Sequence, residues 1–279
     1  MTIILRNMTE ADLPQVKALT QQLQWPHRLS DLQQMLQLGE GTVIVDGTRV
    51  LGSAMGWRWG DRIASLGVVI VAEALRGQGY GRQLMRNMLA RFSDCQVRLH
   101  ATEMGRGLYE KLGFVVTGQV MQHQTRQLGD VAAPLLPAGW QLRAGENGDL
   151  AALTALDYQA SGMVRTRLLT RLLTDASLRV LLDEQQQMRG FAVTRRFGHG
   201  HTVGPLLATD EASAKRLVSD ALCRLAGEFV RLDTPVSRFS PWLTECGLTK
   251  VDSPVAMIHG TPWQPQGAQT FGLMSQAMA

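Results

Sequence analysis

The chain has 279 residues, of which 45% are hydrophobic and 19% charged, a composition typical of a folded protein and too apolar for a disordered one. The formal net charge of +4 comes without a dense run of lysine and arginine interleaved with aromatic residues, which argues against nucleic-acid binding. The 3 cysteines are widely spaced, so neither a disulfide framework nor a metal site is predicted.

The first residues turn polar at Arg6, and no apolar run approaches the length of a membrane span. We therefore expect neither a signal peptide nor a membrane anchor, and a cytoplasmic protein. The length suits two domains of ordinary size or one large one.

The first sixty residues alternate between helical and strand periodicity. Thr9 and Asp12 have the spacing of a loose capping box, and Asp46-Gly47 is a strong hairpin turn signal. The expected elements are a strand at 3–6, a helix through Leu23, a second helix capped by Ser30 or Asp31 and ending at Gly39, and hairpin strands at 41–46 and 50–59.

The stretch around which the chain is organised runs from 63 to 89. Residues 66–71 are apolar and rich in β-branched side chains, which indicates a buried strand. Glycines follow at 77, 79 and 81, and then apolar residues recur at helical spacing to Phe92. A glycine loop leading into a helix N-terminus suits a phosphate or pyrophosphate, because the backbone can approach closely and the first N–H groups are unpaired.

The glycine spacing distinguishes between phosphate loops. No Lys-Ser/Thr pair follows, as a Walker loop requires, and about sixty residues precede the loop, unlike a dinucleotide fingerprint. The pattern Arg76-x-x-Gly79-x-Gly81 instead resembles the pyrophosphate loop of the GNAT superfamily of acetyl-CoA-dependent N-acetyltransferases.

A second stretch extends the resemblance. Residues 97–102 predict a strand, and a short helix then ends at Gly113. The family pattern here is Asn-x-x-Ala-x-x-Leu-Tyr-x-Lys-x-Gly-Phe. Thr102 and Gly105 depart from it at the Asn and Ala positions, and the matching residues are Leu108, Tyr109, Lys111, Gly113 and Phe114. The resemblance covers about residues 2–126.

The resemblance implies an α/β (α+β) fold, with a mixed, mostly antiparallel central sheet flanked by helices, and acetyl-CoA as co-substrate without a metal. It also implies direct attack of an amine in a ternary complex, an N–H near Val71 that polarises the thioester carbonyl, and Tyr109 as the acid that protonates the CoA sulfur. Splayed strands would let the pantetheine arm pair as an added strand. The implied cofactor-binding residues are Val69, Ile70, Val71, Arg76, Gly77, Gln78, Gly79, Tyr80, Gly81, Arg82 and Thr102.

The general base and the acceptor pocket stay open. Glu103, His27 and His123 are candidate bases, and each is also an ordinary polar residue in its position. Trp25, His27 and Trp57 are candidates for the acceptor pocket, with a plain core role competing for Trp57, which alternates with Trp59.

The opening pattern returns after a proline-containing linker at 127–139. Arg6 precedes Asp12 by six residues, and Arg143 precedes Asp149 by the same spacing. Residues 52–60 similarly parallel 190–198. Such self-similarity predicts a repeated unit, so we expect two GNAT-like domains, a catalytic one at 1–126 and a second at 140–279.

The second copy lacks the residues that would hold and use CoA. Asp210 and Glu211 stand where the first copy has its glycine loop, and Leu243 stands at the position of Tyr109. Carboxylates would repel a pyrophosphate, so we expect a degenerate, non-catalytic domain.

Three functions remain open. The leading one is acetyl transfer to a primary amine of a small molecule, amino acid or peptide, with no nucleic-acid or membrane partner and a homodimer left open. The second is acetylation of protein lysines. The third is a non-catalytic acyl-CoA-binding or interaction protein, which the degenerate second copy suggests.

Overall fold

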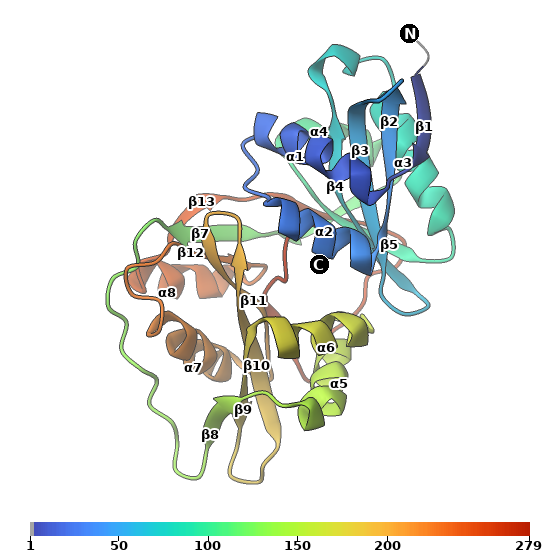
Figure 1. Ribbon diagram of the computed structural model, residues 1–279. Helices are drawn as coiled ribbons and strands as arrows, with labels where there is room; N and C mark the ends of the chain where they lie inside the picture. The colour runs from blue at the N-terminus through green and yellow to red at the C-terminus, as the bar shows by residue number, and fades with distance from the viewer. Residues whose placement is uncertain (1–2) are drawn as a thin grey trace. The chain divides into compact units, whose positions relative to one another are not determined.

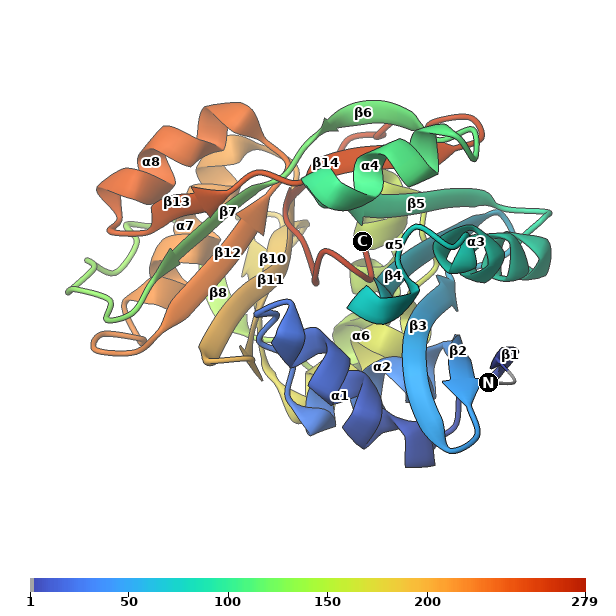
Figure 2. The same ribbon diagram turned by 90° about the horizontal axis from the view of Figure 1, so that it is seen from above.

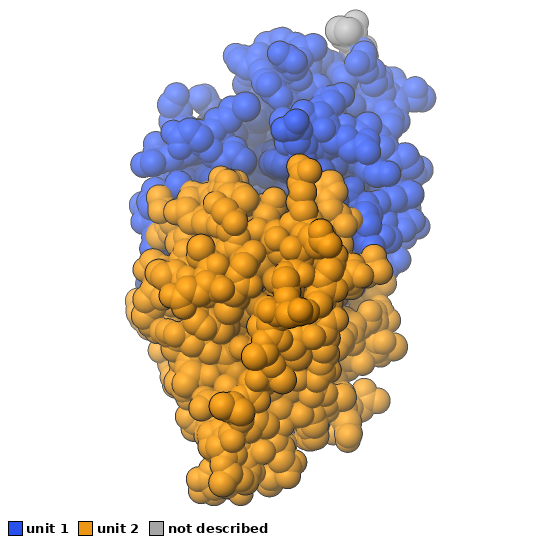
Figure 3. Space-filling model, turned by 90° about the vertical axis from the view of Figure 1, so that its left-hand side faces the viewer, with its two compact units in different colours: residues 1–117, 255–262, 276–279 blue, residues 118–254, 263–275 orange. Residues whose placement is uncertain are grey.

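The computed structural model describes residues 3–279, which divide into two compact units (Figures 1 and 3). Unit 1 consists of residues 3–117, Val255–Pro262 and Gln276–Ala279, and unit 2 of Gly118–Pro254 and Trp263–Ser275. Each unit contains a mixed, mostly antiparallel sheet flanked by helices, as expected. None of the helices within 3–279 is long and apolar enough to cross a membrane.

The sheet of unit 1 has seven strands in the order β1-β2-β3-β4-β5-β14-β6. Only the β4–β5 pairing is described as parallel; the others with a described register are antiparallel. The strands are β1 (Ile3–Asn7), β2 (Glu40–Asp46), β3 (Arg49–Arg58), β4 (Ile63–Val71), β5 (Gln96–Ala101), β6 (Val115–Gln119) and β14 (Val255–His259).

Helices cover both faces of this sheet. Helix α3 (Tyr80–Arg91) buries Leu84, Met85 and Met88 against the strands, and α4 (Glu103–Glu110) joins the same core. Helices α1 (Leu13–Gln22) and α2 (Leu29–Leu38) form a separate buried layer.

The sequence misplaces the start of α2. This helix begins at Leu29 rather than after Ser30 or Asp31, because Asp31 accepts the Arg28 N–H at 2.8 Å and so caps the helix from its third position.

Unit 2 repeats this plan with the order β13-β7-β12-β11-β10-β9-β8, and with β15 paired to β11. Its strands are β7 (Met121–Thr125), β8 (Gln141–Ala144), β9 (Ser177–Leu182), β10 (Met188–Phe197), β11 (Gly200–Ala208), β12 (Val230–Thr234), β13 (Thr249–Asp252) and β15 (Gln269–Gly272). Its helices are α5 (Leu150–Ser161), α6 (Thr166–Asp175), α7 (Glu211–Leu222) and α8 (Ser240–Glu245).

One strand in each sheet comes from the opposite half of the sequence. β14 lies between β5 and β6 in unit 1, and β7 lies between β12 and β13 in unit 2 (Figure 2). Only Val120 separates β6 from β7, and a single residue is too short a loop for a hairpin. The units therefore differ from the contiguous ranges 1–126 and 140–279 expected from the sequence, although the linker 127–139 has no helix or strand.

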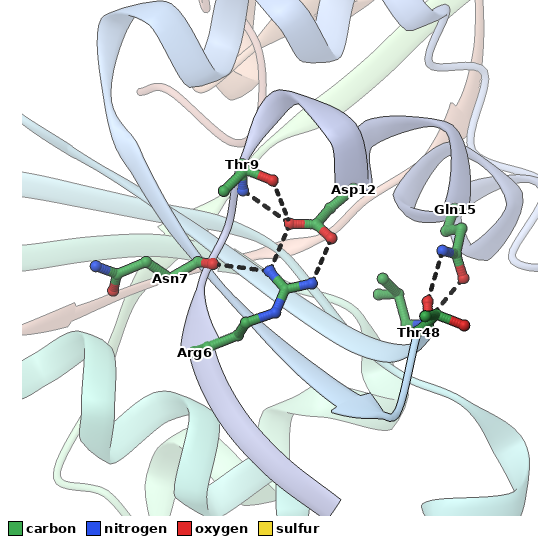
Figure 4. Close-up of polar contacts among 7 residues, drawn as sticks. Arg6, Asn7, Thr9, Asp12, Gln15 and Thr48 are labelled. Carbon is green, nitrogen blue, oxygen red and sulfur yellow. Dashed lines mark hydrogen bonds and ion pairs between the residues drawn. The ribbon is translucent and has the colours of Figure 1, made fainter.

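In both units the repeated Arg–Asp pair joins the first strand to the turn before the first helix. Arg6 donates two hydrogen bonds to Asp12, at 2.7 and 2.8 Å, and the Thr9 N–H donates a third at 2.8 Å (Figure 4). Arg143 and Asp149 repeat the paired bonds at 2.7 and 2.8 Å. The Arg6 hydrogen bonds lower the pKa of Asp12 to about 2.

We expect Asp12→Asn to lower the free energy of unfolding by about 1–3 kcal/mol at pH 7, because the carboxylate accepts charge-assisted hydrogen bonds. The pKa of Asp12 is depressed in the folded state, so the stabilisation is complete above the ordinary pKa and is lost as pH falls towards 2. Urea unfolding at several pH values measures both effects. The exposed Asp61 supplies the control, as Asp61→Asn. Equal stability of Asp12→Asn and wild type at pH 7 would contradict the prediction.

Candidate functional site

Strands β4 and β5 separate after a short pairing. Their parallel register runs from Ile63–Gln96 to Ser65–Arg98 and ends there. A register shift against β3 bends β4, and Val68 has a φ of +53°, a conformation that β-branched residues rarely adopt. The Val68 carbonyl accepts a hydrogen bond from the buried Ser53 hydroxyl at 2.9 Å, which holds the bend.

A cavity of about 830 Å³ lies along the separated strands. Its walls come from β4, the glycine loop, β5 and α4, with Leu23 and Trp25 from the segment after α1. The predicted cofactor-binding residues that line it are Val69, Ile70, Val71, Arg76, Gly77, Gly79, Tyr80, Gly81, Arg82 and Thr102. Gln78 does not line it, because its side chain folds back to donate to the Ala74 carbonyl at 2.9 Å.

The glycine loop leaves the start of α3 uncapped. Gly77 and Gly79 have φ of +75° and +85°, and a Cβ on either would meet nothing within 4 Å. Gly79 occupies the N-cap position of α3 and so supplies no side-chain cap. No side chain caps the first N–H groups of α3, which lie at the positive end of the helix dipole, a position that favours anions.

Helix α4 places a phenol on the cavity. Thr102 caps this helix by accepting the Gly105 N–H at 3.3 Å. Tyr109 lines the cavity, is 7% exposed and packs edge-on against Phe114. Burial raises the pKa of Tyr109 to about 12, so the phenol keeps its proton through the physiological range.

The other predicted site residues divide into two groups. Trp25 and Glu103 line the cavity. Trp57 is fully buried and donates its indole N–H to the Met35 carbonyl at 2.8 Å, so the core role holds. His27 packs beside Trp25 but does not line the cavity.

His123 lies in unit 2 rather than at the cavity of unit 1. It is on β7, has no exposed surface, and its Nε2 is 2.9 Å from the Ser240 hydroxyl. Burial lowers the pKa of its imidazole. A side chain without exposed surface cannot take a proton from a soluble amine, and the sequence placed it wrongly because β7 was expected in the first sheet.

Sequence reasoning missed His100, which lines the cavity from β5. The available signal was its alternation with the apolar residues Val97, Leu99 and Ala101, which places it on the opposite face of the strand.

The equivalent gap in unit 2 is filled by the chain itself. β11 and β12 pair in parallel at His201–Val230 and Thr202–Arg231, and β15 then pairs with β11 at Leu206–Ala208. The Asp210 carboxylate caps α7 by accepting the Ser213 N–H at 2.7 Å. Both the strand gap and the helix N-terminus are thus occupied by protein groups. Among residues 3–279 no group of three potential metal ligands exists.

Comparisons with known proteins place both halves in one family. Residues 39–116 and 153–272 each match an acetyltransferase (GNAT) domain. The chain is 27% identical over 222 residues to the uncharacterised N-acetyltransferase YitH of Bacillus subtilis (strain 168), a match that covers 78% of this chain and 77% of the relative.

Solved structures share the fold. A protein of Pyrococcus horikoshii, provisionally assigned as an acetyltransferase, aligns with a TM-score of 0.80 and 20% identity, over 99% of this chain and 96% of its own. A tandem GNAT protein from the clavulanic acid biosynthesis pathway aligns with a TM-score of 0.67 and 15% identity, over 94% and 100%.

We expect Gly79→Ala to lower CoA affinity at least tenfold, because an L-residue at φ +85° strains the loop that presents the α3 N–H groups. Gly227→Ala in unit 2 is the matched control, since Gly227 has φ +80° and equally open surroundings. Calorimetry with CoA and thermal unfolding separate the effects. Both variants should lose similar stability, and only Gly79→Ala should lose affinity; equal CoA affinity in the two would refute the assignment.

Proposed function

Because the chain belongs to the GNAT N-acetyltransferase family and carries two such domains in tandem, we propose that unit 1 transfers an acetyl group from acetyl-CoA to a primary amine of a small molecule, amino acid or peptide. The observation that carries the proposal is one cavity that joins the gap between β4 and β5 to the uncapped N-terminus of α3.

The chemistry of the lining suits CoA. The cavity is lined by three basic residues, Arg76, Arg82 and Lys111, and by one acidic residue, Glu103. Positive charge therefore predominates where a polyanion would bind. Gly77 and Gly79 leave space that any side chain would fill. A cavity of about 830 Å³ is within the size range of small-molecule and cofactor sites.

Different residues of unit 1 bind acetyl-CoA and transfer protons. The N–H groups that open α3 hold the diphosphate, and the β4 edge beyond Ser65 pairs with the pantetheine arm as an added strand would. An N–H near Val71 stabilises the oxyanion. Tyr109 gives its proton to the departing sulfur. Acetyl-CoA supplies the activated acyl group, so no covalent enzyme intermediate is required.

We expect Tyr109→Phe to lower turnover about 10²–10⁴-fold with little change in acetyl-CoA affinity, because the ring stays while the acid is lost. The measurement is thiol release from acetyl-CoA across a panel of amines, beside calorimetry with acetyl-CoA. Tyr158→Phe is the control, since Tyr158 lies in unit 2 against Trp263.

Unchanged turnover of Tyr109→Phe would remove the acid role. Binding of acetyl-CoA by the wild-type chain without turnover on any amine would remove the transferase proposal and favour a binding module. Turnover on lysine-containing proteins alone would replace the small-amine acceptor by protein lysine.

We expect the full chain to bind one molecule of acetyl-CoA. The corresponding gap in unit 2 is filled by β15, and Asp210 already caps α7. Calorimetry of the full chain measures this stoichiometry. Binding of two molecules of acetyl-CoA with similar affinity would contradict this stoichiometry. Binding at full affinity in Gly79→Ala would contradict it as well.

A further inference from the structure

The last residues of the chain form part of unit 1 beside the separated strands. Gln276–Ala279 belong to this unit, and Met278 is only 2% exposed, so the segment is packed. A Cβ on Gly67 of β4 would lie 2.4 Å from the Ala277 Cβ. Glycine at position 67 therefore allows this segment to lie against β4 (Figure 2).

The same segment contacts an imidazole on β5. The Nδ1 atom of His100 lies 2.7 Å from the Gln276 carbonyl oxygen. A carbonyl oxygen can only accept a hydrogen bond, so Nδ1 carries the proton and donates. In the neutral imidazole the lone pair then belongs to Nε2, the tautomer required of a base that accepts through that atom.

His100 lines the same cavity as the glycine loop and Tyr109. The glycine loop bounds the cavity where the diphosphate would bind, and Leu23 and Trp25 line it from the segment after α1. His100 lines the cavity on β5 and points away from the core, because its neighbours Leu99 and Ala101 are core residues. It thus lies on the strand whose separation from β4 opens the gap.

We propose that His100 is the general base that deprotonates the acceptor ammonium, and that the Gln276 carbonyl is the positioning group that fixes its tautomer. The proposal rests on the acetyl transfer proposed above. It adds a catalytic residue outside the glycine loop and Tyr109, and it makes the last segment of the chain part of the site.

The proton balance closes with these groups. One proton moves from the ammonium to Nε2 of His100, and the neutral amine attacks the thioester carbonyl. The C–N bond forms, the C–S bond breaks, and Tyr109 protonates the sulfur. The second proton lost from nitrogen returns to the Tyr109 oxygen, and His100 releases its proton to water. The amide and the free thiol are the products.

Other titratable groups face the same space. Those that line the cavity are Arg76, Tyr80, Arg82, Glu103, Tyr109 and Lys111. Of these, only Glu103 offers a carboxylate that could serve as an alternative base. It lies in the first turn of α4 and is exposed to solvent.

The first experiment separates the two bases. We expect His100→Gln to lower kcat about 10²–10⁴-fold with acetyl-CoA affinity unchanged, and added imidazole to restore part of the turnover of His100→Ala. His259→Gln is the matched control, because His259 lies on the adjacent strand β14 against Phe114 and outside the cavity. Acetyl-CoA affinity and thermal unfolding show whether each variant is folded.

Two results would overturn the base role while leaving acetyl transfer intact. One is an active wild type with an equally active His100→Gln. The other is a large loss of kcat in Glu103→Gln, together with no recovery of turnover when imidazole is added to His100→Ala. A wild type that acetylates no amine would remove the proposed function itself.

The second experiment tests the positioning contact and does not require turnover. We expect nitrogen-15 NMR of the wild type to show His100 protonated at Nδ1, and a chain ending at Ser275 to lose this preference. That variant should also lose kcat about tenfold or more with acetyl-CoA affinity retained. An Nε2-protonated imidazole in the wild type, or an unchanged kcat after truncation, would refute the role of Gln276.

Discussion

The site depends on the early end of the pairing between β4 and β5. After three paired residues on each strand, β4 bends at Val68 and the Ser53 hydroxyl holds its carbonyl. A left-handed valine costs about 1–3 kcal/mol, a strain that persists only where the surroundings enforce it. In unit 1 the bend at Val68 leaves the facing edges of β4 and β5 unpaired along the cavity. The cavity also reaches the uncapped start of α3.

The two units differ at the helix start and at the strand gap that border this cavity. In unit 1 the glycine loop leaves the start of α3 open, and in unit 2 Asp210 closes the start of α7 with its own carboxylate. The strand gap follows the same division, since β15 fills it in unit 2. The ion pair that joins the first strand to the turn before the first helix is present in both units, as Arg6–Asp12 and Arg143–Asp149.

Local patterns in the sequence predicted most of the elements and the walls of the cavity. The hairpin at Asp46-Gly47 and the glycine loop depend on neighbours in sequence, and both appear in the structure. Helix α4 ends at Glu110, earlier than predicted, and Gly113 is left-handed in the turn that follows. The position of β7 and β14 could not be predicted in this way, because strand partners are set by long-range pairing. His123 was misjudged for that reason, and His100 was missed because its partner, Gln276, lies 176 residues away.

The exchanged strands also bear on how the protein is made. β5 can acquire its neighbour β14 only after Val255–His259 have been synthesised. Until then the nascent N-terminal half carries an open sheet edge, the kind of surface that pairs with other chains. A gene divided at the linker would encode two halves that each lack an inner strand.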